Sequence, residues 1–252
     1  MNKIDRTGEK AINNFGSEMI ICRYNSVRDI DVYFPEYNWI AYGVQYIQFK
    51  KGKIKCPYEP RLYHVGHIGE GEYKCKIDGK LTNEYKIWSG MLKRCYNEAQ
   101  IKRDKVYKDC IVCKEWHNFQ TFSQWYENNY YEIPNELMSL DKDILVKGNK
   151  IYSPDTCVFV PQTINTLFTK SNKSRGKYPI GVDYKNNKFR SRCRTIETKE
   201  IHLGMFNTPQ EAFQAYKKFK ENYIKQVADE YKEYIPRKLY EAMYNYEVEI
   251  GD

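Results

Sequence analysis

The stretch from Tyr178 to Phe219, YPIGVDYKNNKFRSRCRTIETKEIHLGMFNTPQEAFQAYKKF, decides the predicted fold of the C-terminal part of the chain. Its β-rich half contains the dipeptide Asn186-Asn187, which is typical of a hairpin turn because asparagine tolerates positive φ. The pattern predicts three short strands, at residues 181–184, 189–194 and 201–203.

The residues after these strands predict a helix. Thr208 supplies an N-cap, Pro209 occupies the first helical position, and Glu211 completes a capping box. Apolar residues then recur at helical spacing and form the expected buried stripe: Ala212, Phe213, Ala215, Tyr216 and Phe219. Three strands with a helix packed on one face place this region, residues 176–235, in the α+β class.

The middle strand has a one-sided charge pattern. Its sequence, FRSRCR at residues 189–194, alternates arginine with smaller residues. Successive side chains of a strand point to opposite faces, so Arg190, Arg192 and Arg194 are expected to share one face. The residues between them are expected to pack on the helix. Three guanidinium groups, about 7 Å apart, then remain on a face that no helix covers, and no acidic residue is expected on that face.

Basic residues continue beyond this strand. Lys188 and Lys199 lie at the ends of neighbouring strands, and residues 170–204 contain ten Lys and Arg against three acids. Guanidinium pairs bidentately with phosphate or with guanine, and a small antiparallel sheet fits the major groove. We therefore expect double-stranded DNA as the partner, with a solvated strand face as the alternative.

The composition of the whole chain agrees with such a partner. The 252 residues include 41 Lys and Arg against 33 Asp and Glu, a formal charge of +8. Apolar residues make up 41% and aromatic residues 15%, which indicates a folded chain. No run approaches the roughly 18 apolar residues of a membrane span, and the start MNKIDRTGEK has no signal-peptide pattern. We expect a cytoplasmic protein with reduced cysteines and no membrane contact.

The stretch 178–219 resembles an AP2-type DNA-binding domain. The resemblance is carried by a G-V-x-Y start, a strand of basic residues and the pattern H-L-G-x-F-x-T-x-x-E-A-x-x-A-Y. It implies that Arg190, Arg192 and Arg194 read duplex DNA.

Two regions precede the central part of the chain. Residues 1–56 predict a small β-rich module, with β signals at 19–22, 30–34 and 39–49 and a turn at Lys51-Gly52-Lys53. Residues 57–80 predict a linker or a loose hairpin.

Residues 81–172 are expected to form a central domain. Its first helix, capped by Thr82 or Asn83, has one apolar face: Trp88, Met91, Leu92, Cys95 and Tyr96. A second helix is expected from about Glu115. After Pro236, residues 236–252 predict a short C-terminal helix.

The last part of the central domain predicts a strand, a turn, a second strand and a helix. The turn is expected at Gly148-Asn149, and the helix near Ser153 or around Pro161. This order brings the end of a strand close to a helix.

Two residues of this segment have the chemistry of metal ligands. Hydrolysis of a phosphodiester needs a divalent ion held by oxygen atoms. Asp141 at the strand end and Asn165 on the helix form such a pair, and Asn149 is expected to fix the loop between them. A solvated turn at Asp141-Lys142-Asp143 is the alternative.

The central segment resembles the HNH (ββα-metal) endonuclease-like proteins of bacteriophages, which are often joined to AP2-type domains. The resemblance is carried by W-x-x-M-x-x-R-C-Y at 88–96, by V-C-x-E-W-x-x-F-x-x-F at 112–122 and by the residues up to Asn165. It implies an intracellular role in an infected or prophage-carrying bacterium. It also implies Mg²⁺ or Mn²⁺ held by the oxygen pair above, and catalytic positions at Lys142, Asp143 and Asn149.

This resemblance has one departure. The family's catalytic histidine falls on Lys142. An ammonium group between Asp141 and Asp143 is expected to stay protonated, so it can stabilise transition-state charge but is a poor base.

Cysteine and histidine offer weaker signals. Cys110 and Cys113, with Cys95 and Cys157, form a possible four-cysteine zinc site, for which buried free thiols are the alternative. Of the four histidines only His117 lies in the central segment, where an exposed position on a helix is expected.

Two classes of function follow from the sequence. As an enzyme, the protein would be a metal-dependent DNA endonuclease that nicks or cuts at a site chosen by its flanking modules. As a binding protein, it would retain the nuclease fold without the usual base and act as a DNA-binding regulator or interaction protein.

Overall fold

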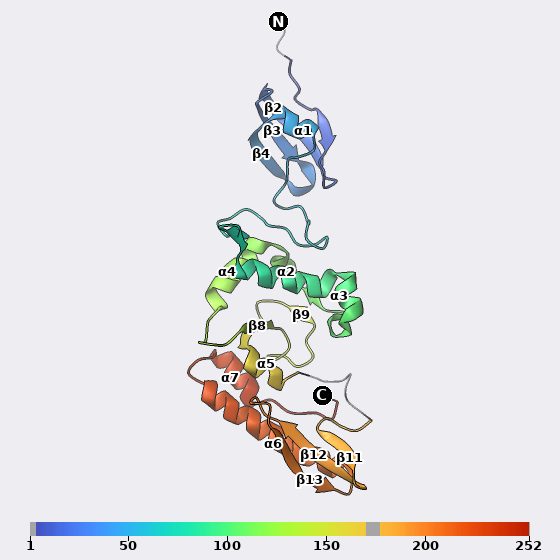
Figure 1. Cartoon of the computed structure of the whole chain (residues 1–252). Helices are drawn as coiled ribbons and strands as arrows, with labels where there is room; N and C mark the ends of the chain where they lie inside the picture. Colours follow the sequence, from blue (N-terminus) through green and yellow to red (C-terminus); the bar gives the residue numbers. More distant parts are fainter. Residues whose placement is uncertain (1–3, 170–176, 252) are drawn as a thin grey trace. The chain divides into compact units, whose positions relative to one another are not determined.

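The computed structural model describes residues 4–169 and 177–251, so the expected boundary between the central and C-terminal domains, at 172–176, lies outside the described residues. The described residues combine helices with antiparallel sheets, which confirms the α+β class. Contacts divide the chain into two compact units, Met1–Asn128 and Asn129–Asp252. The central segment is thus divided near residue 128, and its second half shares a unit with the C-terminal region (Figure 1).

The N-terminal part of the first unit is a four-stranded antiparallel sheet. Its strands are β1 (Lys10–Ile12), β2 (Glu18–Ser26), β3 (Asp29–Phe34) and β4 (Trp39–Val44), in that order. Its core consists of apolar side chains from these strands and from the segment after them: Met19, Ile21, Ile30, Val32, Phe34, Ala41, Phe49, Ile54 and Cys56. The sequence predicts this β-rich module correctly.

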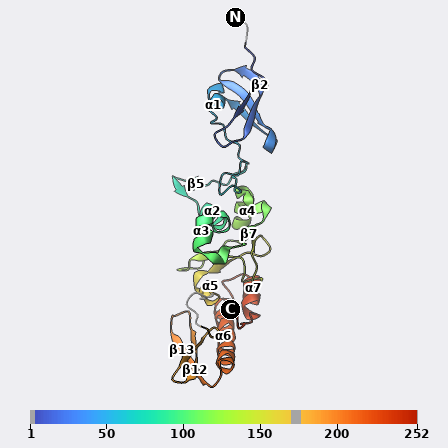
Figure 2. The ribbon, with the colours of Figure 1, turned by 90° about the vertical axis from the view of Figure 1, so that its right-hand side faces the viewer.

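The predicted strand 39–49 is too long. Strand β4 ends at Val44, and a short helix, α1 (Tyr46–Lys50), follows it and lies against the sheet (Figure 2). Gly43, with φ +61°, lies within β4 where its pairing with β3 changes register. Tyr46 and Phe49 are three residues apart and stack with ring centroids 6.2 Å apart, a pairing that a helix brings to one face.

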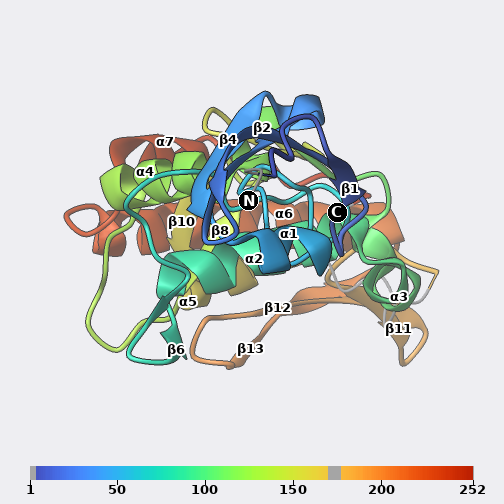
Figure 3. The same ribbon diagram turned by 90° about the horizontal axis from the view of Figure 1, so that it is seen from above.

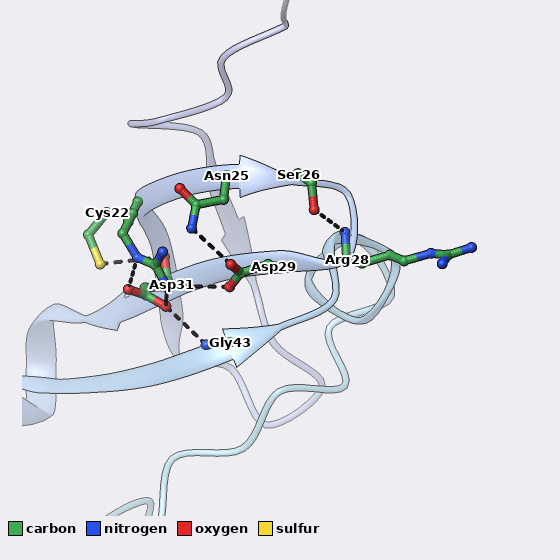
Figure 4. A network of polar contacts seen from close by, with 8 residues as sticks. Cys22, Asn25, Ser26, Arg28, Asp29, Asp31 and Gly43 are labelled. Carbon is green, nitrogen blue, oxygen red and sulfur yellow. Dashed lines mark hydrogen bonds and ion pairs between the residues drawn. The ribbon is translucent and has the colours of Figure 1, made fainter.

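A buried carboxylate connects three strands of this sheet. Asp31 accepts hydrogen bonds from the guanidinium of Arg23 and from the N–H of Gly43, the latter at 2.9 Å (Figure 4). Asp29 extends the network by contacts with Arg23 and Asn25. The hydrogen bond from Arg23 holds the pKa of Asp31 below its usual range, against the opposing effect of burial.

Replacing Asp31 by Asn is therefore expected to lower stability by ~1–3 kcal/mol at pH 7. An aspartate whose pKa is lowered in the folded protein stabilises that protein at pH values above its ordinary pKa of about 4. This contribution is lost as the pH falls and the carboxylate becomes protonated. The difference between wild type and Asp31→Asn should shrink below about pH 4, which thermal unfolding across pH measures. A difference independent of pH would contradict this origin.

The remainder of the first unit is mainly helical. A hairpin of β5 (Lys76–Ile77) and β6 (Lys80–Leu81) lies at the end of the expected linker or hairpin and extends one residue beyond it. The following elements are α2 (Asn83–Tyr96), α3 (Glu98–Arg103), β7 (Ile111–Val112) and α4 (Phe119–Asn129), with 3-10 helices at 105–107 and 114–117; another, at 35–37, joins β3 to β4.

The apolar face predicted for the first helix is buried in α2 and packs against aromatic side chains of the 3-10 helix 114–117 and of α4. Trp88, Trp116, Phe119 and Phe122 are fully buried, and the indole N–H of Trp88 donates to the carbonyl of Trp116 at 2.7 Å. The second predicted helix begins later than expected, at Phe119, because residues 114–117 form a 3-10 turn instead.

The second unit begins with two antiparallel strands and a helix. Strand β8 (Met138–Asp141) pairs with β10 (Val158–Pro161), and α5 (Gln162–Leu167) follows directly. The short strand β9 (Ile151–Tyr152) lies in the connection. The helix therefore begins just after Pro161 rather than near Ser153, where the chain forms a turn.

A three-stranded antiparallel sheet and two helices complete the second unit. The sheet has the order β11 (Val182–Lys185), β12 (Lys188–Arg194), β13 (Glu200–Phe206). Helix α6 (Pro209–Tyr231) follows with the predicted capping box, and α7 (Arg237–Tyr244) covers only part of the predicted C-terminal helix. None of the described helices has both the length and the apolar character that a membrane crossing requires.

Candidate nucleic-acid interface

The alternation predicted for the middle strand is present in β12. Ser191 and Cys193 are buried, and Cys193 packs with Phe213 and Tyr216 of α6. Helix α6 thus covers one face of the sheet, while no described element of the second unit covers the opposite face (Figures 2 and 3). This uncovered face is called the outer face below.

The turn between β11 and β12 sets the register of the outer face. Asn186 and Asn187 both have positive φ, 52° and 57°, as a two-residue hairpin turn requires. The register that follows places Asp183 directly opposite Arg190. On the other side of β12, Arg192 lies opposite His202, and Arg194 lies opposite Glu200.

Two of the three arginines have acidic partners, so the prediction of a face free of acids is wrong. Arg190 donates from Nε to Oδ1 of Asp183 at 3.0 Å and from Nη2 to Oδ2 at 2.7 Å. The Nε atom of Arg192 lies 2.9 Å from the same Oδ2, and its Nη1 donates to Glu200. The hydrogen bond from Arg190 is the main cause that lowers the pKa of Asp183.

Other basic side chains of this surface are unpaired. Lys188, Arg194 and Lys199 are exposed, and none of them has an ion-pair partner among the residues that the structure describes. Lys199 lies in the turn between β12 and β13, where its carbonyl accepts the N–H of Thr195. The outer face therefore contains two arginines held by carboxylates and, at its edges, free cations.

The sequence prediction missed Asp183 and Glu200, although a signal for Asp183 was present. A two-residue turn at Asn186-Asn187 fixes the pairing of the strands that it joins, and counting back from it places Asp183 opposite Arg190. The sequence of β12 contains no acidic residue, and a prediction from that strand alone overlooks the carboxylates of the neighbouring strands.

In the central motif, the end of β8 has a structural role. Oδ1 of Asp141 accepts the backbone N–H groups of Asp143 and Ile144, at 2.8 and 2.7 Å. Burial raises the pKa of Asp141 to about 6, with a further contribution from the carboxylate of Asp143.

The loop after β8 is closed by the amide of Asn149. This amide donates to the carbonyls of Lys142 and Ile151, at 2.6 and 2.7 Å, so Asn149 fixes the loop as expected. Lys142 is buried, and its Nζ lies 3.3 Å from Oδ2 of Asp143 and 5.8 Å from the ring centroid of Tyr152. The ammonium group thus pairs with one neighbouring carboxylate rather than with both.

The second predicted metal ligand, Asn165, lies on α5. It is half-buried, and within the described residues its side chain has no hydrogen-bond partner. Helix α5 packs on both β8 and β10, which places Asp141 and Asn165 on adjoining elements of one small motif.

The cysteines give no support to the zinc prediction, which stays a prediction. Cys95, Cys110 and Cys157 are buried and Cys113 is half-buried, all as free thiols. Burial raises the pKa of Cys113 to about 11, which favours the protonated thiol over the thiolate that zinc binds. No three His, Cys, Asp or Glu side chains within residues 4–169 and 177–251 form a metal-binding group.

The expectation for His117 is wrong. Its ring is half-buried rather than exposed, and it packs edge-on against Tyr96 with centroids 6.0 Å apart. Residue 117 ends a 3-10 turn instead of lying on a helix surface. Burial lowers its pKa, which is typical of a neutral packed histidine.

Comparison of the chain with protein-family models, with curated proteins and with solved structures finds no match.

Replacing Asp141 by Asn is expected to stabilise the protein at pH 7 to 8 by about 3 kcal/mol, because Asn keeps the accepting oxygen and removes a buried charge. Because the pKa of Asp141 is raised in the folded protein, ionisation of this side chain reduces the stability of the protein as the pH rises from about 4 to about 6. The advantage of Asp141→Asn should therefore disappear below about pH 4. Thermal unfolding measures it, and a destabilised variant at pH 8 would contradict the expectation.

Proposed function

We propose that this protein binds double-stranded DNA through the outer face of the β11–β12–β13 sheet. The observation that carries the proposal is the row of basic side chains on an uncovered face, with Arg190, Arg192 and Arg194 pointing away from α6. Such a row can lie against the phosphate charges of a duplex, which attract cations independently of sequence.

The pairing with Asp183 and Glu200 moderates this charge but does not cancel it. Each guanidinium has five N–H groups, and the contacts described above occupy two of them on Arg190 and two on Arg192. Both arginines keep donors for DNA. Lys188, Arg194 and Lys199 keep all of theirs, so they are the groups best suited to phosphate.

Replacing these three free cations together by Ala (Lys188→Ala, Arg194→Ala, Lys199→Ala) is expected to weaken DNA binding and to reduce its salt dependence. Each lost phosphate contact should lower the slope of log affinity against log salt by about one. Fluorescence anisotropy with a labelled duplex at several salt concentrations measures both effects.

A matched control removes the same charge elsewhere, by Lys76→Ala, Lys80→Ala and Lys218→Ala, which change exposed lysines outside the outer face. The control should bind almost like the wild type. The proposal fails if the test variant also binds like the wild type, or if the control is weakened to the same degree.

A second candidate function is metal-dependent cleavage of DNA. The strand–strand–helix order of β8, β10 and α5 favours it, with Asp141 at the end of the first strand and Asn165 on the helix. One carboxylate and one amide oxygen suit a Mg²⁺-like ion, which retains several waters when protein ligands are few. Oδ2 of Asp141 and the amide oxygen of Asn165, whose side chain has no hydrogen-bond partner among the described residues, are the atoms that would hold it. Such an ion would supply charge stabilisation at the phosphoryl group.

The residues around this pair favour weak catalysis or none. Lys142, at the position where the resemblance expects a base, is buried, and its Nζ lies against Asp143 and Tyr152. Asn149 is engaged with backbone carbonyls on both sides of the loop. These contacts support the alternative proposal, a DNA-binding regulator or interaction protein that keeps a nuclease-like motif for its structure.

Plasmid nicking with Mg²⁺ or Mn²⁺ separates the two proposals. A nuclease centre predicts that Asp141→Asn and Asn165→Ala reduce nicking at least about a hundredfold while duplex binding is retained, and that Lys142→His increases nicking by supplying a base. Absence of metal-dependent nicking by the wild type supports the regulator. Equal nicking by the wild type and Asp141→Asn would show that the central motif is not the catalytic site.

A further inference from the structure

One carboxylate lies between the two central arginines of the outer face. Asp183 contacts Arg190 through both of its oxygens and Arg192 through one of them. An acid is unfavourable on a surface that binds phosphate by charge alone, because it repels DNA. Its placement requires another physical role.

We infer that Asp183 is a positioning residue that gives this sheet its sequence specificity, for duplex DNA with guanines about two base pairs apart. The inference rests on the proposed DNA binding and deepens it. Arg190 and Arg192 would read bases, whereas Lys188, Arg194 and Lys199 would contact phosphates.

The geometry of the pair supports base reading. The contacts from Nε and Nη2 fix the plane of the Arg190 guanidinium and leave its Nη1 group free. A guanidinium held in this way can present two parallel N–H groups to O6 and N7 of guanine. Residues 190 and 192 of a strand are about 7 Å apart, which matches two base-pair steps of about 3.4 Å each.

A role in stability is a poor explanation for these contacts. The side chain of Asp183 is 31% exposed, and those of Arg190 and Arg192 are 24% and 41% exposed. Ion pairs with this exposure contribute little to folding. They do restrict the rotamers of two long side chains before DNA arrives, which reduces the entropy lost when bases are contacted. Asp183→Asn should therefore fold normally.

The test begins with a selection of the full-length wild type on a duplex library with a randomised segment. Affinities are then measured for the selected duplex and for a duplex of shuffled sequence. For Asp183→Asn we expect tighter binding to the shuffled duplex, because one negative charge is removed, and a specificity ratio about ten to a hundred times lower.

Glu197→Gln is the matched control. It removes the same charge from the turn between β12 and β13, where Glu197 has no contact with Arg190 or Arg192 among the interactions described for these residues. This variant should bind both duplexes slightly more tightly and keep the specificity ratio of the wild type.

Three results overturn the inference while leaving the proposed DNA binding in place. These are a specificity ratio of Asp183→Asn within twofold of the wild type, an equal loss in Glu197→Gln, and selection of no preferred sequence by the wild type. Failure of the proposed function itself is recognised separately, by unchanged DNA affinity when Lys188, Arg194 and Lys199 are replaced together.

Discussion

The apolar side chains of α6 belong to two separate hydrophobic cores, and the folding of the second unit depends on this helix. Near its N-terminus, Phe213 and Tyr216 pack with Cys193 of the sheet. Near its C-terminus, α6 joins β10, α5, α7 and the loop after β8 in a second cluster, whose buried residues are Ile144, Val158, Val160, Ile164, Leu167, Ile224, Val227, Ala228, Ile235, Leu239 and Met243. Burial of apolar area is the main driving force of folding, so the basic sheet and the central motif are stabilised through one helix.

This arrangement determines what remains available for binding. Because α6 covers the inner face of the three-stranded sheet, the charged side chains of β12 can reach solvent only on the outer face. The carboxylates of β11 and β13 then meet these arginines across the strands, as cross-strand pairs in an antiparallel sheet do. This surface differs from a uniformly basic one. The arginines held by carboxylates have a fixed orientation toward a ligand, whereas the cations at the edges attract negatively charged phosphate.

Local signals predicted much of this architecture, and long-range contacts decided the rest. The Asn186-Asn187 turn and the Thr208–Glu211 capping box act over a few residues, so the sequence placed them correctly. Strand β13 contains a bulge, where Gly204 has φ +137° and the register shifts by one residue, which no alternation pattern indicated. The 39–49 run was misassigned because its apolar residues fit both a strand and a short helix. The burial of Lys142, and the carboxylates opposite β12, depend on tertiary placement.

Hydrogen–deuterium exchange of the full chain, with and without duplex DNA, tests the central claim most directly. Binding through the outer face predicts slower exchange in peptides from residues 182–206, with little change in the N-terminal sheet at residues 10–44. Slower exchange in the N-terminal sheet with none in residues 182–206 would contradict the account, as would a pattern unchanged by DNA at saturating concentration.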